Sequence, residues 1–126
     1  RISLGTTVEG REIPLVILSD PPVDSPAAAR ALDRPIVFTF ANIHAGEVCG
    51  KEATLMLIRE IALDPDHDLL DDVVMVFAPI YNADGNERFA PDNRPGQIGP
   101  REMGQRPNAQ GLDLNRDYVK LESPEA

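Results

Sequence analysis

Two side chains that can bind a metal ion, His44 and Glu47, lie three positions apart in the sequence. The apolar segment 35–41 before them predicts a buried strand, and segment 47–63 predicts a helix. At such a junction both side chains can point into one small volume. An imidazole nitrogen together with a carboxylate oxygen suits zinc. The same pair is also consistent with a surface histidine and a glutamate that stabilises the first helical turn through the helix dipole.

Two later segments have their own polar motifs. Segment 79–85 reads Pro-Ile-Tyr-Asn-Ala-Asp-Gly, and Arg106 precedes segment 111–117, which reads Gly-Leu-Asp-Leu-Asn-Arg-Asp. In this order the three motifs resemble those of the zinc carboxypeptidases of the carboxypeptidase A/B type, most closely a bacterial branch whose last motif ends in Asn-Arg-Asp-Tyr. Segment 4–13 is similar to the first hairpin of that catalytic domain, so the resemblance covers nearly the whole chain.

The resemblance implies an α/β fold with a mixed, mainly parallel sheet flanked by helices. It also implies that His44 and Glu47 are zinc ligands. The family's last zinc ligand and its catalytic glutamate would lie beyond Ala126, so residues 1–126 are expected to be the N-terminal part of a single catalytic domain. We therefore expect this chain by itself to bind zinc weakly and to lack peptidase activity.

By the same resemblance, Asp113 would hold the ring of His44 from the side away from the metal, as a carboxylate commonly does for a metal-bound histidine. Arg106 would polarise the scissile carbonyl, and Asn115 and Arg116 would bind the terminal carboxylate of the substrate. The alternatives are an aspartate that only caps a turn and arginines that are solvated surface charges.

Other residues near these motifs receive different interpretations. Relatives often have an arginine before the zinc glutamate and an asparagine after the Asn-Arg pair, whereas this chain has Gly46 and Asp117, which leaves the substrate preference open. We interpret the turn formers of the second motif, Asn82, Asp84 and Gly85, as architectural. The arginines outside the motifs, Arg88, Arg94 and Arg101, are interpreted as surface charges.

Composition limits the possible functions. The chain has 126 residues, a size typical of one domain, and a formal net charge of −9 that argues against nucleic acid as a partner. No apolar stretch reaches the roughly 20 residues needed to span a bilayer. Cys49, the single cysteine, is expected to be a small core residue. His67, the only other histidine, would follow the predicted helix, too far from His44 to be a third ligand.

The remaining patterns predict the elements around the motifs. Segments 2–8 and 12–19 predict an antiparallel hairpin, and segment 24–33 a connector with at most one short helical turn. A second buried strand at 72–79 completes a βαβ unit with segments 35–41 and 47–63. The helix would bury Cys49, Ala53, Met56, Leu57 and Ile61. Segment 82–110 has no periodicity and predicts a loop that is either functional or disordered.

Together these features favour a zinc-dependent carboxypeptidase-like hydrolase that cleaves a peptide or small amide next to a free carboxylate. Two alternatives remain open, a zinc amidohydrolase of acylated amino acids or cell-wall peptides, and a non-catalytic binding module of the same fold. An extracytoplasmic location is expected from the resemblance alone.

Overall fold

The computed structural model describes residues 2–64 and 67–126, which form a sheet with helices around it. The strand order is β1-β2-β4-β3, with β1 at Ile2–Thr6, β2 at Glu12–Leu18, β3 at Ile36–Phe40 and β4 at Val74–Ala78. The β1–β2 and β2–β4 pairs are antiparallel, and the β3–β4 pair is parallel. The predicted mixed α/β fold is confirmed. Parallel pairing is nevertheless limited to one of the three strand pairs in the described part of the chain.

The first hairpin forms where it was predicted. Its turn closes through hydrogen bonds from the Thr7 N–H to the Arg11 carbonyl (2.9 Å) and from the Gly10 N–H to the Thr7 carbonyl (3.0 Å). Gly10 has a φ of 81°, a conformation that glycine adopts without steric cost. The following connector contains helix α1, Pro26–Ala31, whose first turn is capped by the Ser25 side chain.

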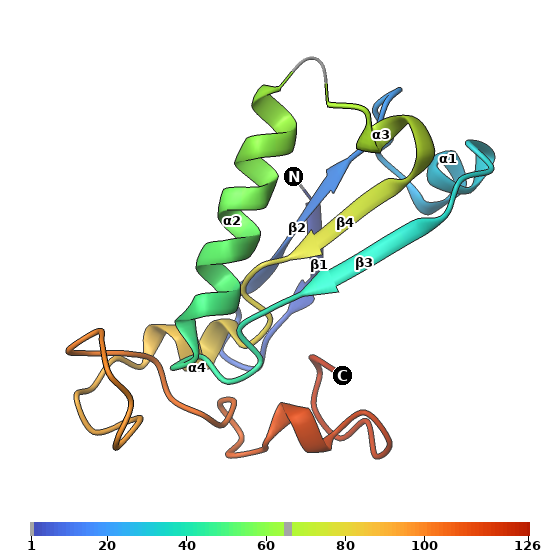
Figure 1. Ribbon diagram of the computed structural model, residues 1–126. Coiled ribbons are helices and arrows are strands. Elements are labelled where there is room, and N and C mark those ends of the chain that lie inside the picture. Colours follow the sequence, from blue (N-terminus) through green and yellow to red (C-terminus); the bar gives the residue numbers. More distant parts are fainter. Residues whose placement is uncertain (1, 65–66) are drawn as a thin grey trace.

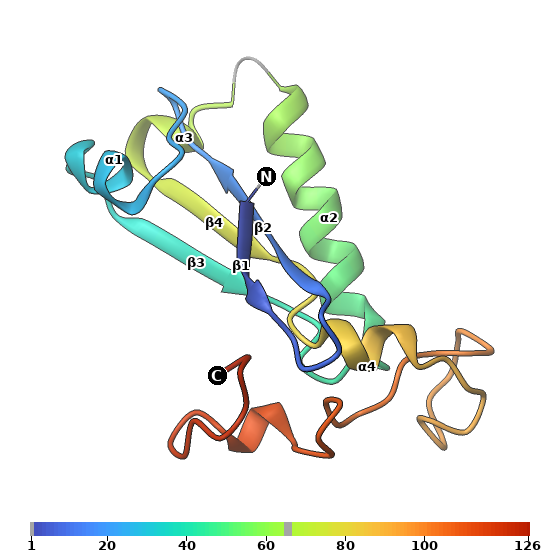
Figure 2. The ribbon, with the colours of Figure 1, turned by 180° about the vertical axis from the view of Figure 1, so that it is seen from behind.

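Helix α2, Val48–Leu63, lies along one face of the sheet (Figures 1 and 2). Thr54 and Ile61 are its buried residues, and Ile58 is half-buried. Except for Ile61, the predicted buried face is wrong, because Cys49, Ala53, Met56 and Leu57 are exposed. Apolar residues occur on nearly every side of this helix, so periodicity alone does not determine which side packs on the sheet.

The core between α2 and the sheet centres on Ile61, Met75 and Phe77, and strand β4 supplies two of these three residues. The prediction that the second strand is buried is confirmed. Strand β3 differs, because Ile36, Val37 and Phe38 are each at least 40% exposed. The prediction that this strand is buried on both faces is wrong for the described residues, since β3 is an edge strand with β4 as its neighbour.

The segment predicted as a long loop contains helix α4, Ala83–Glu87, directly after β4; the short helix α3, Leu69–Asp72, precedes that strand. A bridge between Ala90 and Met103 closes the middle of the loop. The chain then passes beneath the carboxyl ends of β3 and β4 and forms the 3-10 turn η1, Leu114–Arg116 (Figure 1). This path brings the C-terminal segment to the strand ends where the first motif lies.

Candidate metal and substrate site

His44 is placed by the segment that continues strand β3. Asn42 turns the chain with a φ of 62°, and its side-chain amide donates to the Ala45 carbonyl at 3.0 Å. The Asn82 N–H donates to the Asn42 carbonyl at 3.2 Å, so the segments that follow β3 and β4 remain paired past the ends of these strands. His44 is therefore held at the carboxyl end of a parallel strand pair, where α/β sheets form ligand crevices.

The side chains of His44 and Glu47 converge as expected. The His44 Nδ1 lies 3.3 Å from the Glu47 Oε1, and the imidazole is 95% buried whereas the carboxylate is 43% exposed. Glu47 occupies the N-cap position of α2, but its side chain makes no capping hydrogen bond. The Glu47 carboxylate nevertheless lies at the N-terminus of α2, a position that is also compatible with stabilisation of the first turn through the helix dipole.

Asp113 holds the opposite side of the His44 ring. Its Oδ1 lies 2.8 Å from the His44 Nε2 and also accepts from the Asn115 N–H at 3.0 Å. Its Oδ2 accepts from the Nε and Nη2 of Arg106 at 3.1 and 2.9 Å. Burial acts to raise the pKa of Asp113, but the hydrogen bonds from His44, Arg106 and the Asn115 N–H lower that pKa to about 2.

This arrangement defines the chemistry of the His44–Glu47 pair. Because the Asp113 carboxylate is ionised near neutral pH, the His44 Nε2 carries a proton and donates it to that carboxylate. In the neutral tautomer with its proton on the Nε2, the Nδ1 lone pair faces the Glu47 carboxylate at 3.3 Å. Two electron-pair donors at this distance are suited to share a cation, and imidazole with carboxylate is a donor set that zinc accepts.

Two arginines add positive charge beside Glu47. The Nη2 of Arg94 lies 2.8 Å from the Glu47 Oε1, and the Nη1 of Arg106 lies 3.9 Å from the same oxygen. Asn115 and Arg116 follow Asp113 in η1, and both side chains are exposed. The structure thus brings His44, Glu47, Arg106 and Asp113 into one cluster, with Asn115 and Arg116 on the turn beside it.

The second motif fixes the segments that form this cluster. The Asn82 Nδ2, fully buried, donates to the carbonyls of Ile43, Arg106 and Pro107 at 3.2 to 3.3 Å. Its Oδ1 accepts from the Gly85 N–H at 2.9 Å. One side chain therefore links the His44 segment, the start of α4 and the Arg106 segment.

Asp84 links the same region to the first hairpin. Its carboxylate accepts from the Thr7 hydroxyl at 2.7 Å, the Glu9 N–H at 3.1 Å and the Arg11 guanidinium at 2.7 Å. The architectural interpretation of the second motif agrees with these contacts.

Comparison with known proteins agrees with this geometry. The zinc carboxypeptidase family profile matches residues 1–125. This chain belongs to the zinc carboxypeptidase family. It is 33% identical over 131 residues to carboxypeptidase D of Mus musculus, covering 92% of this chain and 10% of that protein. It is 30% identical over 128 residues to the carboxypeptidase N catalytic chain of Homo sapiens, covering 94% of this chain and 26% of that protein.

The fold of this zinc carboxypeptidase chain is also that of solved family members. A metallo-carboxypeptidase from Burkholderia cenocepacia superposes with a TM-score of 0.67 and 26% identity, over 98% of this chain and 30% of that one. The chain therefore spans at most about a third of the relatives named here.

The described part of this chain does not contain a complete set of side chains for a metal site. Within residues 2–64 and 67–126, no group of three or more His, Cys, Asp or Glu side chains is arranged to hold a metal ion. His44 and Glu47 supply two donors, and catalytic zinc usually has three protein ligands and a water. In the same residues, no helix combines the length and the apolar character that crossing a membrane requires.

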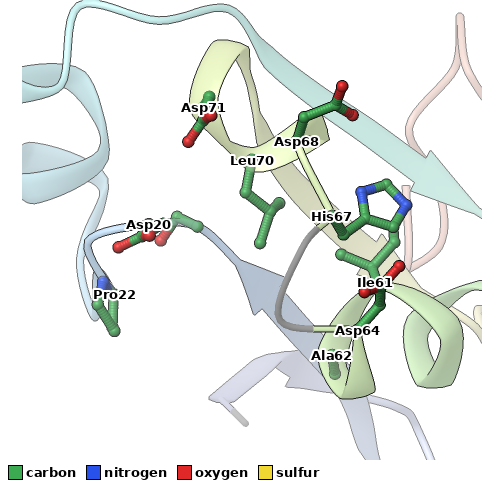
Figure 3. A pocket seen from close by; sticks show the side chains of 10 residues that line it. Asp20, Pro22, Ile61, Ala62, Asp64, His67, Asp68, Leu70 and Asp71 are labelled. Carbon is green, nitrogen blue, oxygen red and sulfur yellow. The ribbon is translucent and has the colours of Figure 1, made fainter.

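A separate hollow of about 460 Å³ lies at the opposite end of the sheet (Figure 3). His67 and Asp68 line it together with Asp20, Leu70 and Ile61, and the His67 Nδ1 accepts from the Leu69 N–H at 3.3 Å. His67 is thus a residue between two helices, as predicted, and this hollow is not part of the His44 site.

The sequence interpretation missed Arg94. The interpretation of Arg94 as a surface charge is wrong, because its side chain is only 25% exposed and pairs with Glu47. Position 94 lies in a segment without periodicity, so no local pattern indicates its contact 47 residues earlier. The one available signal was Gly46, which leaves space beside Glu47 for a side chain from elsewhere.

Proposed function

We propose that the complete protein is a zinc-dependent metallocarboxypeptidase-like hydrolase that cleaves a peptide or amide bond near a free carboxylate. The observation that supports this proposal most directly is the His44 ring, whose Nδ1 faces Glu47 at 3.3 Å while its Nε2 is held by Asp113 at 2.8 Å. A buried ring fixed in this way presents one nitrogen, in one tautomer, to a cation beside the glutamate.

His44 and Glu47 would hold the zinc ion, with a third ligand from another segment of the complete protein. When bound, zinc supplies Lewis acidity that lowers the pKa of a bound water. Asp113 keeps the proton on the Nε2 of His44 and so leaves the Nδ1 available. The Nε and Nη2 of Arg106 are bound to Asp113, which directs its Nη1 toward Glu47.

The arginines would bind and orient the substrate. Arg106, held next to the ligand pair, places a fixed positive charge where negative charge develops on a scissile carbonyl. Asn115 and Arg116, exposed on η1, offer an amide and a guanidinium to the terminal carboxylate. A substrate bound at both places would have its last peptide bond near His44 and Glu47.

The test is peptide hydrolysis by the complete, zinc-loaded protein and by two histidine variants. His44→Gln should abolish cleavage of an N-acylated dipeptide with a free C-terminus. His67→Gln, which changes the other histidine at the far end of the sheet, should retain it. Equal activity in the two variants would contradict the proposed metal site.

Substrate form then separates the open alternatives. A carboxypeptidase should lose most of its activity on the same dipeptide with an amidated C-terminus, and Arg116→Gln should reduce this difference. Preferred hydrolysis of acylated single amino acids would instead identify an amidohydrolase. Binding of these compounds without turnover would identify a binding module.

A further inference from the structure

Arg94 occupies the space that a side chain at position 46 would take. A Cβ built on Gly46 would lie 2.4 Å from the Cγ of Arg94 and 3.0 Å from its Cδ, both far closer than van der Waals contact allows. The aliphatic part of the Arg94 side chain therefore packs directly on the backbone of Gly46. Its guanidinium ends beside the Glu47 carboxylate, with the Nη2 at 2.8 Å from the Oε1.

Gln97 fixes the loop in this position. Its side-chain amide donates to the Gly46 carbonyl at 2.9 Å, and its backbone N–H donates to the Arg94 carbonyl at 3.2 Å. The amide also contacts the Met103 sulfur at 3.2 Å, and Met103 is buried. Arg94 is thus held by a loop that is anchored to the site at Gly46 and closed on itself at the buried Met103, unlike an arginine on a free surface.

Arg94 and Arg106 line the same open cleft, of about 530 Å³, together with Asn93, Pro95, Gly96 and Gln97. Both guanidinium groups approach the same oxygen of Glu47, at 2.8 and 3.9 Å. Once Glu47 shares its charge with a cation, its attraction for Arg94 weakens, and the guanidinium can bind a second anion. One arginine is sufficient to stabilise a single substrate carbonyl, so the second arginine in this cleft is available to bind another anionic group.

We propose that Arg94 is a substrate-binding residue that selects peptides with an acidic side chain next to the scissile bond, in addition to the terminal carboxylate. This inference rests on the proposed function. These 126 residues have a formal net charge of −9, so a general attraction of this chain for anions does not explain such a preference. The preference arises from the local pairing of Arg94 with the substrate carboxylate.

The experiment compares peptides that differ only in Glu or Gln. One pair has Glu or Gln as the C-terminal residue, and a second pair has Glu or Gln just before it. The complete zinc-loaded protein should cleave the Glu peptide of at least one pair with a kcat/KM about tenfold higher, the size expected for one charge-assisted hydrogen bond. Arg94→Gln should reduce this ratio to about one, because the Glu peptide loses more kcat/KM than the Gln peptide.

Arg101→Gln is the matched control, because Arg101 is an exposed arginine of the same loop. It should keep the Glu preference of the unchanged protein. The proposal is overturned if the unchanged protein shows no Glu preference in either pair, or if Arg94→Gln keeps that preference. An equal loss on Glu and Gln peptides in Arg94→Gln would also overturn it, because Arg94 would then act on Glu47 and not on the substrate charge.

Calorimetry separates failure of this inference from failure of the proposed function. It measures binding of the Glu and Gln peptides of both pairs, which requires no turnover. If no peptide is cleaved, the proposed function fails, and the calorimetric comparison still decides the role of Arg94. Tighter binding of the Glu peptide of at least one pair that is lost in Arg94→Gln supports the inference, and equal binding within both pairs overturns it.

Discussion

Replacing Asp113 by Asn tests how the His44 ring is held. The asparagine has nearly the same shape, but it has one acceptor oxygen where the aspartate has two. If that oxygen faces His44, the amide NH₂ points at the Arg106 guanidinium, and the hydrogen bonds at 2.9 and 3.1 Å are lost. If the amide NH₂ faces His44, the Nε2 must accept, and the ring proton moves to the Nδ1 that faces Glu47.

Either orientation should weaken metal binding. In the first orientation Arg106 loses its anchor, and in the second the metal-facing nitrogen carries a proton. Removal of the partner that orients a ligating histidine typically costs 10- to 100-fold in metal affinity, or about 1.4 to 2.7 kcal/mol. We expect a loss in this range for zinc bound to the complete Asp113→Asn protein.

The assay is competition for zinc with a chromophoric chelator at neutral pH. Asp92→Asn is the control, because Asp92 is an exposed aspartate of the 88–103 loop and the substitution makes the same change of charge. Nitrogen-15 chemical shifts of the His44 ring report the tautomer directly and should show the proton on the Nε2. A zinc affinity within about twofold of the unchanged protein, or a wild-type ring protonated only at the Nδ1, would refute the reasoning.

Three further predictions concern stability, measured by denaturant unfolding of the complete protein. Asn82→Ala leaves the carbonyls of Ile43, Arg106 and Pro107 without their side-chain donor, so it should lower the free energy of unfolding by at least about 3 kcal/mol. Asn115→Ala, at an exposed position, should lower it by less than about 0.5 kcal/mol. Similar values for the two variants would contradict this prediction. Gly46→Ala should cost about 1 to 3 kcal/mol, and adding Arg94→Ala should not restore stability, because the new Cβ would still lie 2.7 Å from the Gly104 carbonyl oxygen. Gly5→Ala, where nothing lies within 4 Å of the added Cβ, is the control. The folded-state pKa of Asp113 is lowered from 3.8 to about 2, so its ionised carboxylate stabilises the fold above about pH 4 by about 2 kcal/mol, and this contribution should disappear as the pH falls toward 2. Asp113→Asn should remove that part of the acid dependence, and an unchanged pH profile would argue against it.

The sequence by itself determined the local elements and the chemistry of the site. The hairpin turn at Gly10 and the strand–helix junction at His44 form at the predicted positions, because turn chemistry and apolar runs act over a few residues. His44 and Glu47 could be singled out because an imidazole and a carboxylate at such positions suit a metal, whereas Asp113 was identified through the family resemblance. The predicted contact between His44 and Asp113 depended on the family resemblance, since the two residues lie 69 positions apart.

Only the tertiary structure decided which surfaces are buried and which charges meet. Helix α2 packs on the sheet through Thr54, Ile58 and Ile61. Because this helix is apolar on nearly every side, the position of the sheet determines which side is buried, and Cys49 is exposed for the same reason. Strand β3 has the sequence of a buried strand but lies at an edge, since burial depends on the neighbouring elements and not on the strand itself. Arg94 pairs with Glu47 because a loop without periodicity folds over Gly46. The space beside Gly46 is filled by the Arg94 side chain only in this folded arrangement.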